Sequence, residues 1–600
     1  MPTTNLSRPH RFYIAKRYFK GHSDTQSHPR KTENEIRDMT EKATPERQTL
    51  AGEAALKLWR QGRDAWNNWI YQHPDWDISF AGVDFSCERN PNQNLFFSGY
   101  RFGDGNVDFT DVTFGDGDVN FNNANFGDGN VNFSNATFGD GTLDFAGVTF
   151  GKGNVNFTNS TFGRGKISFS DAKFDQGNLK FSVTKFGGNL IDFSRTNFDN
   201  RYVSFYHTNI GEGVLVFSGA KFKNCNLDFF DAIFGAVDLY LARTTFDKGG
   251  LNFLGATFGK GILHLSAATF NDGDVFFAEV SLGNCVINLS QAQIRNLHFN
   301  PKMIGSSSIE AEGLSIEGRA IFTLPSSASK LKSLNLRSAS FDGPLTLKGD
   351  LSIIPDLRAT RYSHQVDLSA LTVKLRRRWQ KPGRRSNQWS VKAVSETGII
   401  SRLAYKLARK KWINLRYFNR LRRLWKHHCW PIKLSRVAEA PQDGARLRRL
   451  KEIAETNKDH QAALRFSADE NRAKRWIETP WLGSILDMAF SFFCNYGQSI
   501  LRPTFWLGVI FALSTYAYKS LATVKFTNEL TAWVQAFILS TSNSLPFLPQ
   551  SRELRTGALL ALYDTTDPSS FIDALMITQG VLSFIFLFLI GLGLRNRFRL

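Results

Sequence analysis

Aspartates at a fixed spacing are the first residues in this sequence that could do chemistry. Each lies between two glycines, in the recurring sequence Phe-Gly-Asp-Gly: Asp104, Asp116, Asp128 and Asp140. Carboxylate oxygens stacked along one edge could bind Ca²⁺, which takes oxygen ligands. The next three positions of this column hold other side chains: Lys152, Arg164 and Gln176. Because cations repel Ca²⁺, we interpret these segments as turns in which glycine supplies positive φ, with calcium binding as the alternative.

Histidine and cysteine side chains are the second candidates for chemistry. His427, His428 and Cys429 are adjacent, but no further metal ligand lies near them in the sequence. Five cysteines in 600 residues, none in a C-x-x-C pair, are typical of neither a zinc site nor a disulfide scaffold. The sequence also has no phosphate-binding loop, no nucleophile elbow and no H-E-x-x-H motif. We therefore predict no catalytic, cofactor or metal site and no enzymatic activity.

An uncharged polar run that precedes Pro546 is the third candidate. It offers hydroxyl and amide oxygens from four side chains: Ser540, Thr541, Asn543 and Ser544. Such oxygens can replace part of the hydration shell of an ion in a channel. These four residues are candidate pore-lining residues, provided that membrane-spanning elements flank them.

A 12-residue repeat dominates the elements that must position these side chains. One column runs from Phe102 to Ile294 and has 17 members, of which 14 are Phe. A second column starts at Phe97 and holds Phe or Leu, and a third starts at Leu95 and holds Val, Leu or Ile. A fourth, which starts at Val112, is small or β-branched. The columns contain no insertion or deletion, which predicts a repeat architecture.

The apolar positions within a unit predict two short strands. A large residue follows a smaller one two positions earlier, as in Val107 and Phe109, and alternate residues of a strand share a face. One unit per coil would be too narrow for two Phe rings, whereas two units give about 24 residues and four sides per coil, stacked ~4.8 Å apart. The predicted fold is mainly β solenoid, with nine named core residues: Phe102, Phe109, Phe114, Phe121, Phe126, Phe133, Phe138, Phe145 and Phe157.

The spacing in VNFSNATF (131–138) resembles the pentapeptide-repeat family, whose members are mostly bacterial. The resemblance implies a right-handed quadrilateral β-helix. It covers residues 77–300 as a regular solenoid and continues less regularly over 301–373. This chain departs from the family pattern by adding two residues to every second pentapeptide, and the four-sided coil is therefore our own inference.

The residues before the repeat are predicted to form a tail and a cap. Residues 1–43 are basic and lack the apolar run of a signal peptide, so we expect a flexible tail, with a nucleic-acid-binding arm as the alternative. Residues 44–76 contain a helix start at Thr44-Pro45-Glu46 and an apolar stripe with Trp59 and Trp66, which predicts a helical cap. The sequence LWRQGRDAWNNW resembles the cap of membrane-associated members of the family.

Positive charge is concentrated after the repeat. The chain carries a net charge of +20, and residues 371–437 contain 20 Lys and Arg against one acidic residue. Residues 374–477 are predicted to be a basic helical juxtamembrane region that lies on anionic lipid, with packing on a neighbouring helix and nucleic-acid binding as alternatives. The candidate lipid-contacting residues are Arg409, Lys410, Arg416, Arg420, Arg422, Arg423 and Lys426.

Residues 478–600 are predicted to form an α-helical membrane module. The uncharged stretch 574–594 is long enough to cross a bilayer, and 503–521 is predicted to be an earlier span whose Lys519 reaches the interface. We expect an interfacial helix over 481–495 and either a re-entrant segment or an interfacial helix over 531–548. Basic residues flank both spans, so both termini are predicted to be cytoplasmic in a multi-pass protein of a bacterial inner membrane.

Two functions follow from these elements. NYGQSILRPTFWL and FLFLIGLGLRNRFR resemble the C-terminal module of bacterial pentapeptide-repeat membrane proteins, some of them channel-like. The first hypothesis is an inner-membrane-anchored scaffold whose cytoplasmic solenoid binds a protein or a second copy, so that a homo-oligomer is expected. The alternative is an oligomeric ion channel or effector pore gated by the solenoid. No T-V-G-Y-G filter is present, so potassium selectivity is not predicted.

Overall fold

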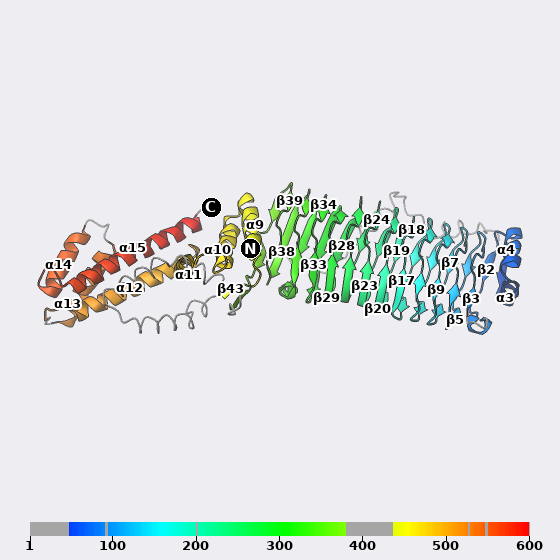
Figure 1. Cartoon of the computed structure of the whole chain (residues 1–600), viewed down its shortest axis with the longest axis horizontal. Coiled ribbons are helices and arrows are strands. Elements are labelled where there is room, and N and C mark those ends of the chain that lie inside the picture. The colour runs from blue at the N-terminus through cyan, green and yellow to red at the C-terminus, as the bar shows by residue number, and fades with distance from the viewer. Residues whose placement is uncertain are drawn as a thin grey trace, which may run out of the picture.

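The computed structural model describes residues 47–89, 94–199, 202–379, 436–525, 528–545 and 550–598. The molecule is elongated, with a long β-solenoid followed by a bundle of helices (Figure 1). Three predicted features lie outside the described residues: the tail 1–43, the candidate lipid-contacting residues between Arg409 and Lys426, and the His427–Cys429 cluster.

The solenoid extends over residues 49–373 with about 24 residues per coil, and its three sheets are parallel. The first sheet contains β1 (Thr49–Ala51), β2 (Asp77–Ser79), β4 (Val107–Asp108), β7 (Val131–Asn132), β11 (Val155–Asn156), β15 (Leu179–Lys180), β19 (Tyr202–Ser204), β22 (Asn226–Asp228), β25 (Leu251–Asn252), β28 (Asp274–Ala278), β31 (Asn296–Asn300), β35 (Ala320–Thr323), β38 (Leu345–Leu351), β40 (Val366–Asp367) and β41 (Leu371–Val373).

The second sheet contains β10 (Thr149–Phe150), β14 (Lys173–Phe174), β18 (Asn197–Phe198), β21 (Lys221–Phe222), β24 (Thr245–Phe246), β27 (Thr269–Phe270), β30 (Gln293–Ile294), β34 (Ser315–Ile316), β37 (Ser340–Phe341) and β39 (Arg361–Tyr362). The third sheet contains β3 (Leu95–Phe96), β5 (Thr113–Gly115), β6 (Val119–Asn120), β8 (Thr137–Phe138), β9 (Leu143–Asp144), β12 (Thr161–Phe162), β13 (Ile167–Ser168), β16 (Lys185–Phe186), β17 (Asn189–Asp192), β20 (Asn209–Val216), β23 (Ile233–Tyr240), β26 (Thr257–His264), β29 (Ser281–Asn288), β32 (Met303–Ile304), β33 (Ser308–Glu310) and β36 (Ser333–Asn335).

Each coil has four sides, as predicted. In one coil they are formed by β4, by β5, by β6 and by Asn125, which pairs with Thr149 of the next coil. Two of the four sides belong to the third sheet, because β20 and the longer strands after it continue around the corner that joins those sides. The register advances by one whole coil from strand to strand, as in the pairing of Val107 with Val131. The 12-residue unit is therefore half a coil.

Stacked Phe rings fill the interior. Phe157 lies between Phe133 and Phe181, with ring centroids 4.8 and 4.9 Å away and ring planes within 1° and 5° of parallel. All nine core residues named from the sequence are buried, with at most 4% of their surface exposed. A fully buried Phe stabilises a fold by about 1.5–3 kcal/mol relative to an exposed one, so these ladders supply much of the driving force for folding.

The tight corner of each unit is a turn with one left-handed residue. The backbone φ is 58° at Asp111 and 55° at Asn123, and the same sign recurs at the equivalent position of each later unit as far as Gln291. The N–H of Val112 donates to the carbonyl oxygen of Phe109 across this turn. Positive φ at the third residue is the geometry of a type II turn, which Asn, Asp and Gly adopt most easily.

The glycines of the Gly-x-Gly corners, where x is Asp or Lys, have the predicted positive φ at Gly103, Gly115, Gly117 and Gly127 and a different role at other positions. In several coils, as at Gly141 and Gly153, their φ is not positive. A Cβ at Gly153 would overlap the carbonyl oxygen of Gly129, one coil earlier, and a Cβ at Gly141 would overlap that of Gly117. Glycine is needed there because successive coils approach closely, and the prediction of positive φ is wrong at these positions.

Two helices close the N-terminal end of the solenoid (Figure 1). The predicted single cap helix is divided into α3 (Gly52–Arg60) and α4 (Arg63–Gln72), because Gly62 between them has a φ of 94°. Trp66 is fully buried with its ring 5.8 Å from that of Phe80, and its Nε1 donates to the carbonyl oxygen of Arg101. A 3-10 turn, η1 (Phe85–Glu88), follows.

The C-terminal end of the solenoid is covered by residues that the sequence placed in the juxtamembrane region. The 3-10 turn η2 (Ser326–Lys330) lies in the last coils, and β42 (Arg377–Trp379) pairs antiparallel with β43 (Arg436–Ala438). Helices α9 (Asp443–Thr456) and α10 (His460–Lys474) follow. Three fully buried residues of α9 belong to the hydrophobic core of the solenoid: Leu447, Leu450 and Ile453. The solenoid thus has a cap at both ends, as an open end would expose apolar side chains.

An ion-pair cluster fastens this second cap. The carboxylate of Asp356, in the last coils, lies 2.7 Å from Nη2 of Arg358 and 3.2 Å from Nε of Arg446 in α9. Burial by itself would raise the pKa of Asp356, but hydrogen bonds from Arg358 and the charge of Arg446 outweigh it and lower the pKa below its usual range. The carboxylate is therefore charged and paired where the cap meets the coils.

The helical bundle comprises α11 (Trp481–Cys494), α12 (Leu501–Ser520), α13 (Glu529–Ser544), α14 (Ser551–Tyr563) and α15 (Ser570–Phe598). Helices α12 and α15 are antiparallel, since Asn596 donates to Gly497 near the start of α12 and Tyr518 donates to Gln579 near its end. Helix α11 coincides with the predicted helix 481–495 to within one residue, and most of α13 lies within the predicted segment 531–548.

One described helix, α15, is long and apolar enough to cross a membrane by length and composition. It contains the predicted span 574–594. Helix α12 has 20 residues and covers all but the last residue of the predicted span 503–521, but its composition does not meet the same test. The structure therefore supports one candidate span where the sequence predicted two.

Candidate functional site

The outer surface of the solenoid carries polar ladders that bond to one another between coils. Asn135 Nδ2 donates to Asp111 Oδ1 at 2.9 Å, and Asn159 Nδ2 donates to Asn135 Oδ1 at 2.9 Å. Each bond joins equivalent residues of successive coils. These amides and carboxylates stabilise the stacking of successive coils.

The aspartates that could have bound calcium accept backbone hydrogen bonds instead. Asp116 Oδ1 accepts from the N–H of Asp140 at 3.1 Å, and Asp140 Oδ1 accepts from the N–H of Arg164 at 2.8 Å. Among the described residues, no group of three or more His, Cys, Asp or Glu side chains could hold a metal ion. The observed contacts are those expected of turn residues.

An aromatic patch interrupts the polar surface at one corner of the solenoid. We define this aromatic patch as Val183, Tyr206, Phe230, Ile233 and Leu254. The rings of Tyr206 and Phe230 stack at 5.4 Å, and Tyr206, Val183 and Ile233 are 39%, 47% and 49% exposed. The positions of Tyr206 and Phe230 hold Thr or Ser in earlier coils, as at Thr110 and Ser134. Exposed apolar residues grouped in this way mark interaction surfaces.

A buried carboxyl group lies on the side of the solenoid formed by the first sheet. Asp228 is 4% exposed and accepts hydrogen bonds from the Tyr202 hydroxyl, from Asn252 Nδ2 at 2.7 Å and from the N–H of Phe230 at 3.1 Å. Burial raises the pKa of Asp228 above its usual range and outweighs the lowering effect of these bonds. The same burial raises the pKa of Tyr202.

A buried arginine joins the C-terminal cap to the helical bundle. Arg475, directly after α10, places Nε 2.7 Å from Oδ2 of Asp487 in α11. Its Nη2 donates to the Tyr496 hydroxyl at 2.9 Å, and that hydroxyl donates to Asp487 at 2.9 Å. Because Arg475 is only 7% exposed, the pair is shielded from water, which fixes α11 to the end of the solenoid.

A buried polar network connects three helices of the bundle. We define this polar network as Tyr518 of α12, three residues of α13 and two of α15: Ser540, Asn543, Ser544, Gln579 and Ser583. Gln579 accepts from Tyr518 and donates to Ser540 Oγ at 2.8 Å and Ser544 Oγ at 3.0 Å. Asn543 Nδ2 lies 3.2 Å from the Tyr518 hydroxyl, and Ser583 Oγ lies 3.3 Å from Ser544 Oγ. Hydrogen bonds of this kind hold helices together where water is absent.

The structure therefore places the four candidate pore-lining residues as follows. Ser540, Asn543 and Ser544 bond within one chain, to partners on α12 and α15. Thr541 is half-buried and donates to the carbonyl oxygen of Phe537 in its own helix. Their role at a pore stays a prediction, and water or an ion would have to replace part of the polar network to reach them.

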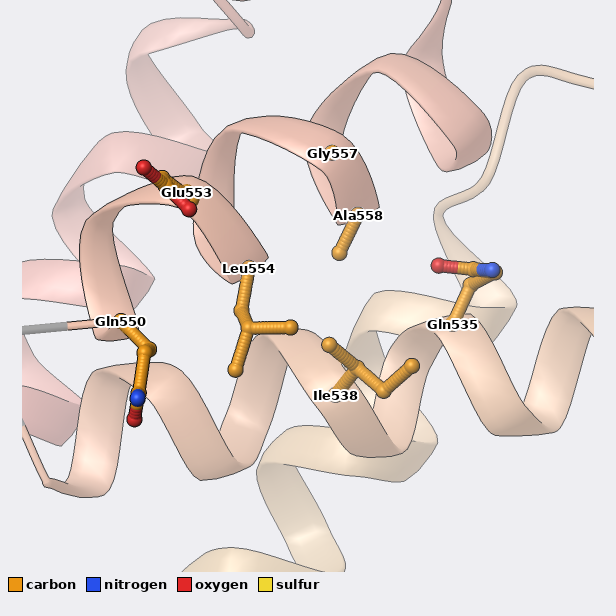
Figure 2. Close-up of a pocket in the computed structure, with 7 residues that line it drawn as sticks. All are labelled: Gln535, Ile538, Gln550, Glu553, Leu554, Gly557 and Ala558. Carbon is orange, nitrogen blue, oxygen red and sulfur yellow. The ribbon is translucent and has the colours of Figure 1, made fainter.

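A groove lies between α13 and α14 on the outside of the bundle (Figure 2). It has a volume of about 610 Å³ and is lined by Gln535 and Ile538 of α13 and by the first two turns of α14, including Glu553, Leu554 and Gly557. A Cβ at Gly557 would meet no atom within 4 Å. The groove is thus open at a glycine and carries both apolar and polar side chains.

Several of these residues were not identified from the sequence. Helix α14 was not predicted, because its first half, Ser-Arg-Glu-Leu-Arg-Thr, resembles a polar loop. Gln579 and Ser583 were treated as part of an uncharged span, although a Gln inside such a span is itself a signal of a buried polar contact. Tyr518 lies near the end of the predicted span 503–521, and the structure buries it fully.

No family assignment accompanies these features. Comparison of the chain with models of protein families, with curated proteins and with solved structures found no match.

Proposed function

We propose that this chain is a membrane-anchored scaffold of the pentapeptide-repeat type, whose solenoid binds a protein or a second copy at a bacterial inner membrane. The observation that carries the proposal is that the exposed surface changes from polar on the solenoid to apolar on the last helix. The solenoid exposes mostly polar ladders, whereas α15 exposes Ile577, Phe584 and Phe588, each at least 64%. A contiguous apolar surface on a long helix is stable in lipid and not in water.

Both long helices of the bundle are proposed to span the bilayer. The uncharged stretch 574–594 matches a hydrocarbon thickness of about 30 Å at 1.5 Å per residue. Helix α12 is antiparallel to it and has Arg502 in its first turn, so both basic ends, with Arg595 and Arg597, lie on one side, which we assign to the cytoplasm. At the opposite end Lys519 lies 5.2 Å from the Trp533 ring, an arrangement typical of an interface.

The scaffold function is proposed to use the side of the solenoid, because α3, α4, α9 and α10 cover its two ends. The aromatic patch is the candidate contact for a protein partner, since its residues are apolar, rigidly held by the coils and accessible. Aromatic side chains are enriched where proteins bind one another.

Retention in membranes tests the anchor. Full-length protein should stay in cell membranes after an alkaline carbonate wash. Phe584→Lys with Phe588→Lys should move most of it to the supernatant, because each Lys near the centre of a span costs about 2.5–3.5 kcal/mol. Phe571→Lys with Phe598→Lys is the matched control, since these side chains are equally exposed but lie outside 574–594. Release of the wild-type protein would contradict the proposal.

A second function, an oligomeric channel, is favoured by one observation. Helix α13 brings Ser544 to Ser583, near the middle of the uncharged stretch, so a polar network would lie inside the bilayer. Polar groups at that depth mark ion paths or helix contacts. Planar-bilayer recordings of the full-length protein test this function: Asn543→Leu or Ser544→Leu should change unitary conductance or ion preference. Absence of conductance from wild-type protein would leave only the anchor.

A further inference from the structure

The helical hairpin formed by α13 and α14 reaches deep into the bundle. Helix α13 runs parallel to α15, because Ser540 contacts Gln579 and Ser544 contacts Ser583. Helix α14 returns beside α13 and ends at the far end of α12, where the Tyr563 hydroxyl donates to the carbonyl oxygen of Tyr518. The start of α14 is therefore the deep end of the hairpin, beside the half of the uncharged stretch that contacts α13.

That deep end is charged on its outer face. Arg552, Glu553 and Arg555 are all exposed, and none of them forms an ion pair within the described part of the chain. The outer face of α15 at the same depth is apolar, with Ile577 67% and Val581 55% exposed. Charged side chains that face lipid tails are costly, and in membrane proteins they pair with one another or line a polar interior. Contact with lipid tails would therefore be unfavourable for this face of α14.

We propose that the groove between α13 and α14 is the surface through which copies of this chain associate in the membrane. This inference rests on the proposed insertion of the bundle in a bilayer. The occupant of the groove is a second copy, because the surface carries both signs of charge. Glu553 of one copy can pair with Arg552 or Arg555 of the next, so the same patch supplies donor and acceptor. Pairing between copies takes Glu553 and one of the two arginines of each copy out of contact with lipid.

The shape of the groove fits a helix from the neighbouring copy. Gly557 and Ala558, two neighbouring residues of α14 that line the groove, are both small (Figure 2). Small residues let two helix backbones approach closely in a membrane, where packing and hydrogen bonds replace the hydrophobic effect as the driving force. Gln535 and Gln550 on the two walls add side-chain amides that can bond across the contact.

A glycine series tests the interface. Gly557→Leu adds a side chain at the groove, at a position where a Cβ meets no atom within 4 Å, whereas Gly508→Leu and Gly591→Leu add the same side chain at equally open positions of α12 and α15. The oligomeric state of full-length protein, measured by mass photometry over a dilution series in detergent and in lipid nanodiscs, is the readout. We expect Gly557→Leu to weaken association about tenfold and the two control variants to associate as the wild type does.

A charge exchange provides the second test. Glu553→Arg should dissociate the oligomer, and Glu553→Arg combined with Arg555→Glu should restore it, because the pair is re-formed in reverse. Wild-type protein that floats with liposomes but stays monomeric overturns the interface and leaves the anchor intact. Protein that does not float overturns the anchor and, with it, this inference. An equal effect of Gly557→Leu and Gly591→Leu also contradicts the interface.

Discussion

The rings of Phe133 and Phe157 are parallel to within 1°, with their centroids 4.8 Å apart. This separation equals the usual distance between neighbouring strands, so each ring lies directly over its counterpart in the previous coil. A ring thus contacts the same residue type above and below, and the interior repeats as regularly as the backbone. Stacking of this kind makes the core sensitive to the loss of one ring.

Replacement of one ring should destabilise the solenoid locally. We expect Phe157→Ala to lower the free energy of unfolding by about 3–5 kcal/mol, because it leaves a cavity that Phe133 and Phe181 cannot fill. Chemical denaturation of the full-length protein followed by circular dichroism measures the change. Thr161→Ala, at an exposed position of the same coil, is the control and should cost less than about 1 kcal/mol. Equal costs would refute the stacked interior.

The corner glycines provide a matched pair of variants. Gly153→Ala should cost about 2 kcal/mol or more, since its methyl group would overlap the carbonyl oxygen of Gly129 and push two coils apart. Gly211→Ala, where no atom lies within 4 Å and φ is not positive, should be neutral or slightly stabilising. Thermal melting of both variants is the measurement, and similar melting temperatures would show that close stacking does not explain the glycine.

Asp228 should make stability depend on pH. Its pKa is raised from 3.8 by burial, so its protonated form stabilises the fold at low pH and this contribution is lost as pH rises through the raised pKa. Asp228→Asn should therefore increase stability at pH 7 by about 1 kcal/mol and leave stability at pH 3 nearly unchanged. Asp175→Asn, at an exposed position of an earlier coil, is the control. A loss of stability at pH 7 in Asp228→Asn would contradict the expectation.

The polar network should stabilise the bundle through Gln579. In Gln579→Leu the hydroxyls of Ser540, Ser544 and Tyr518 lose a buried partner, and we expect a loss of about 1–2 kcal/mol. Thr578→Leu alters the neighbouring residue, whose hydroxyl donates to the carbonyl oxygen of Ala574 in its own helix, and should have little effect. Thermal unfolding in detergent compares the two variants, and a larger effect at Thr578 would rule out the network as a stabilising element.

The solenoid could be predicted from the sequence because each Phe column repeats the same spacing of 12 residues many times. Phe109, Phe133 and Phe157 recur with the period of one coil, about 24 residues, and only a coil of that length stacks them. The reason for glycine at Gly153 could not be obtained in this way, since it depends on how closely two coils approach. The left-handed conformation at Asp111 was also not predicted, because side chains as different as Val183 and Arg195 occupy the same position in later coils.

The helical half was predicted less completely, for a different reason. Leu447 and Leu450 of α9 alternate with Arg446, Arg448 and Arg449, so composition suggested a basic surface helix, whereas the structure buries the leucines against the last coils. The hydroxyls and the amide of α13 suggested a pore, but their partners lie 25–39 residues away on α12 and α15. Contacts between distant segments leave no local pattern, so periodicity alone does not reveal them.

The repeat unit determines the direction in which each surface of the solenoid faces around its long axis. One unit turns the chain through half a coil, so two surfaces point the same way only when a whole number of coils separates them. Removal of two consecutive units would shorten the rod by one coil and keep every surface aligned with the caps. Removal of a single unit would preserve the Phe ladders. It would, however, rotate the coils and the cap before the deletion by half a revolution relative to the coils after it. The length of this protein can therefore change without rotation only by pairs of units.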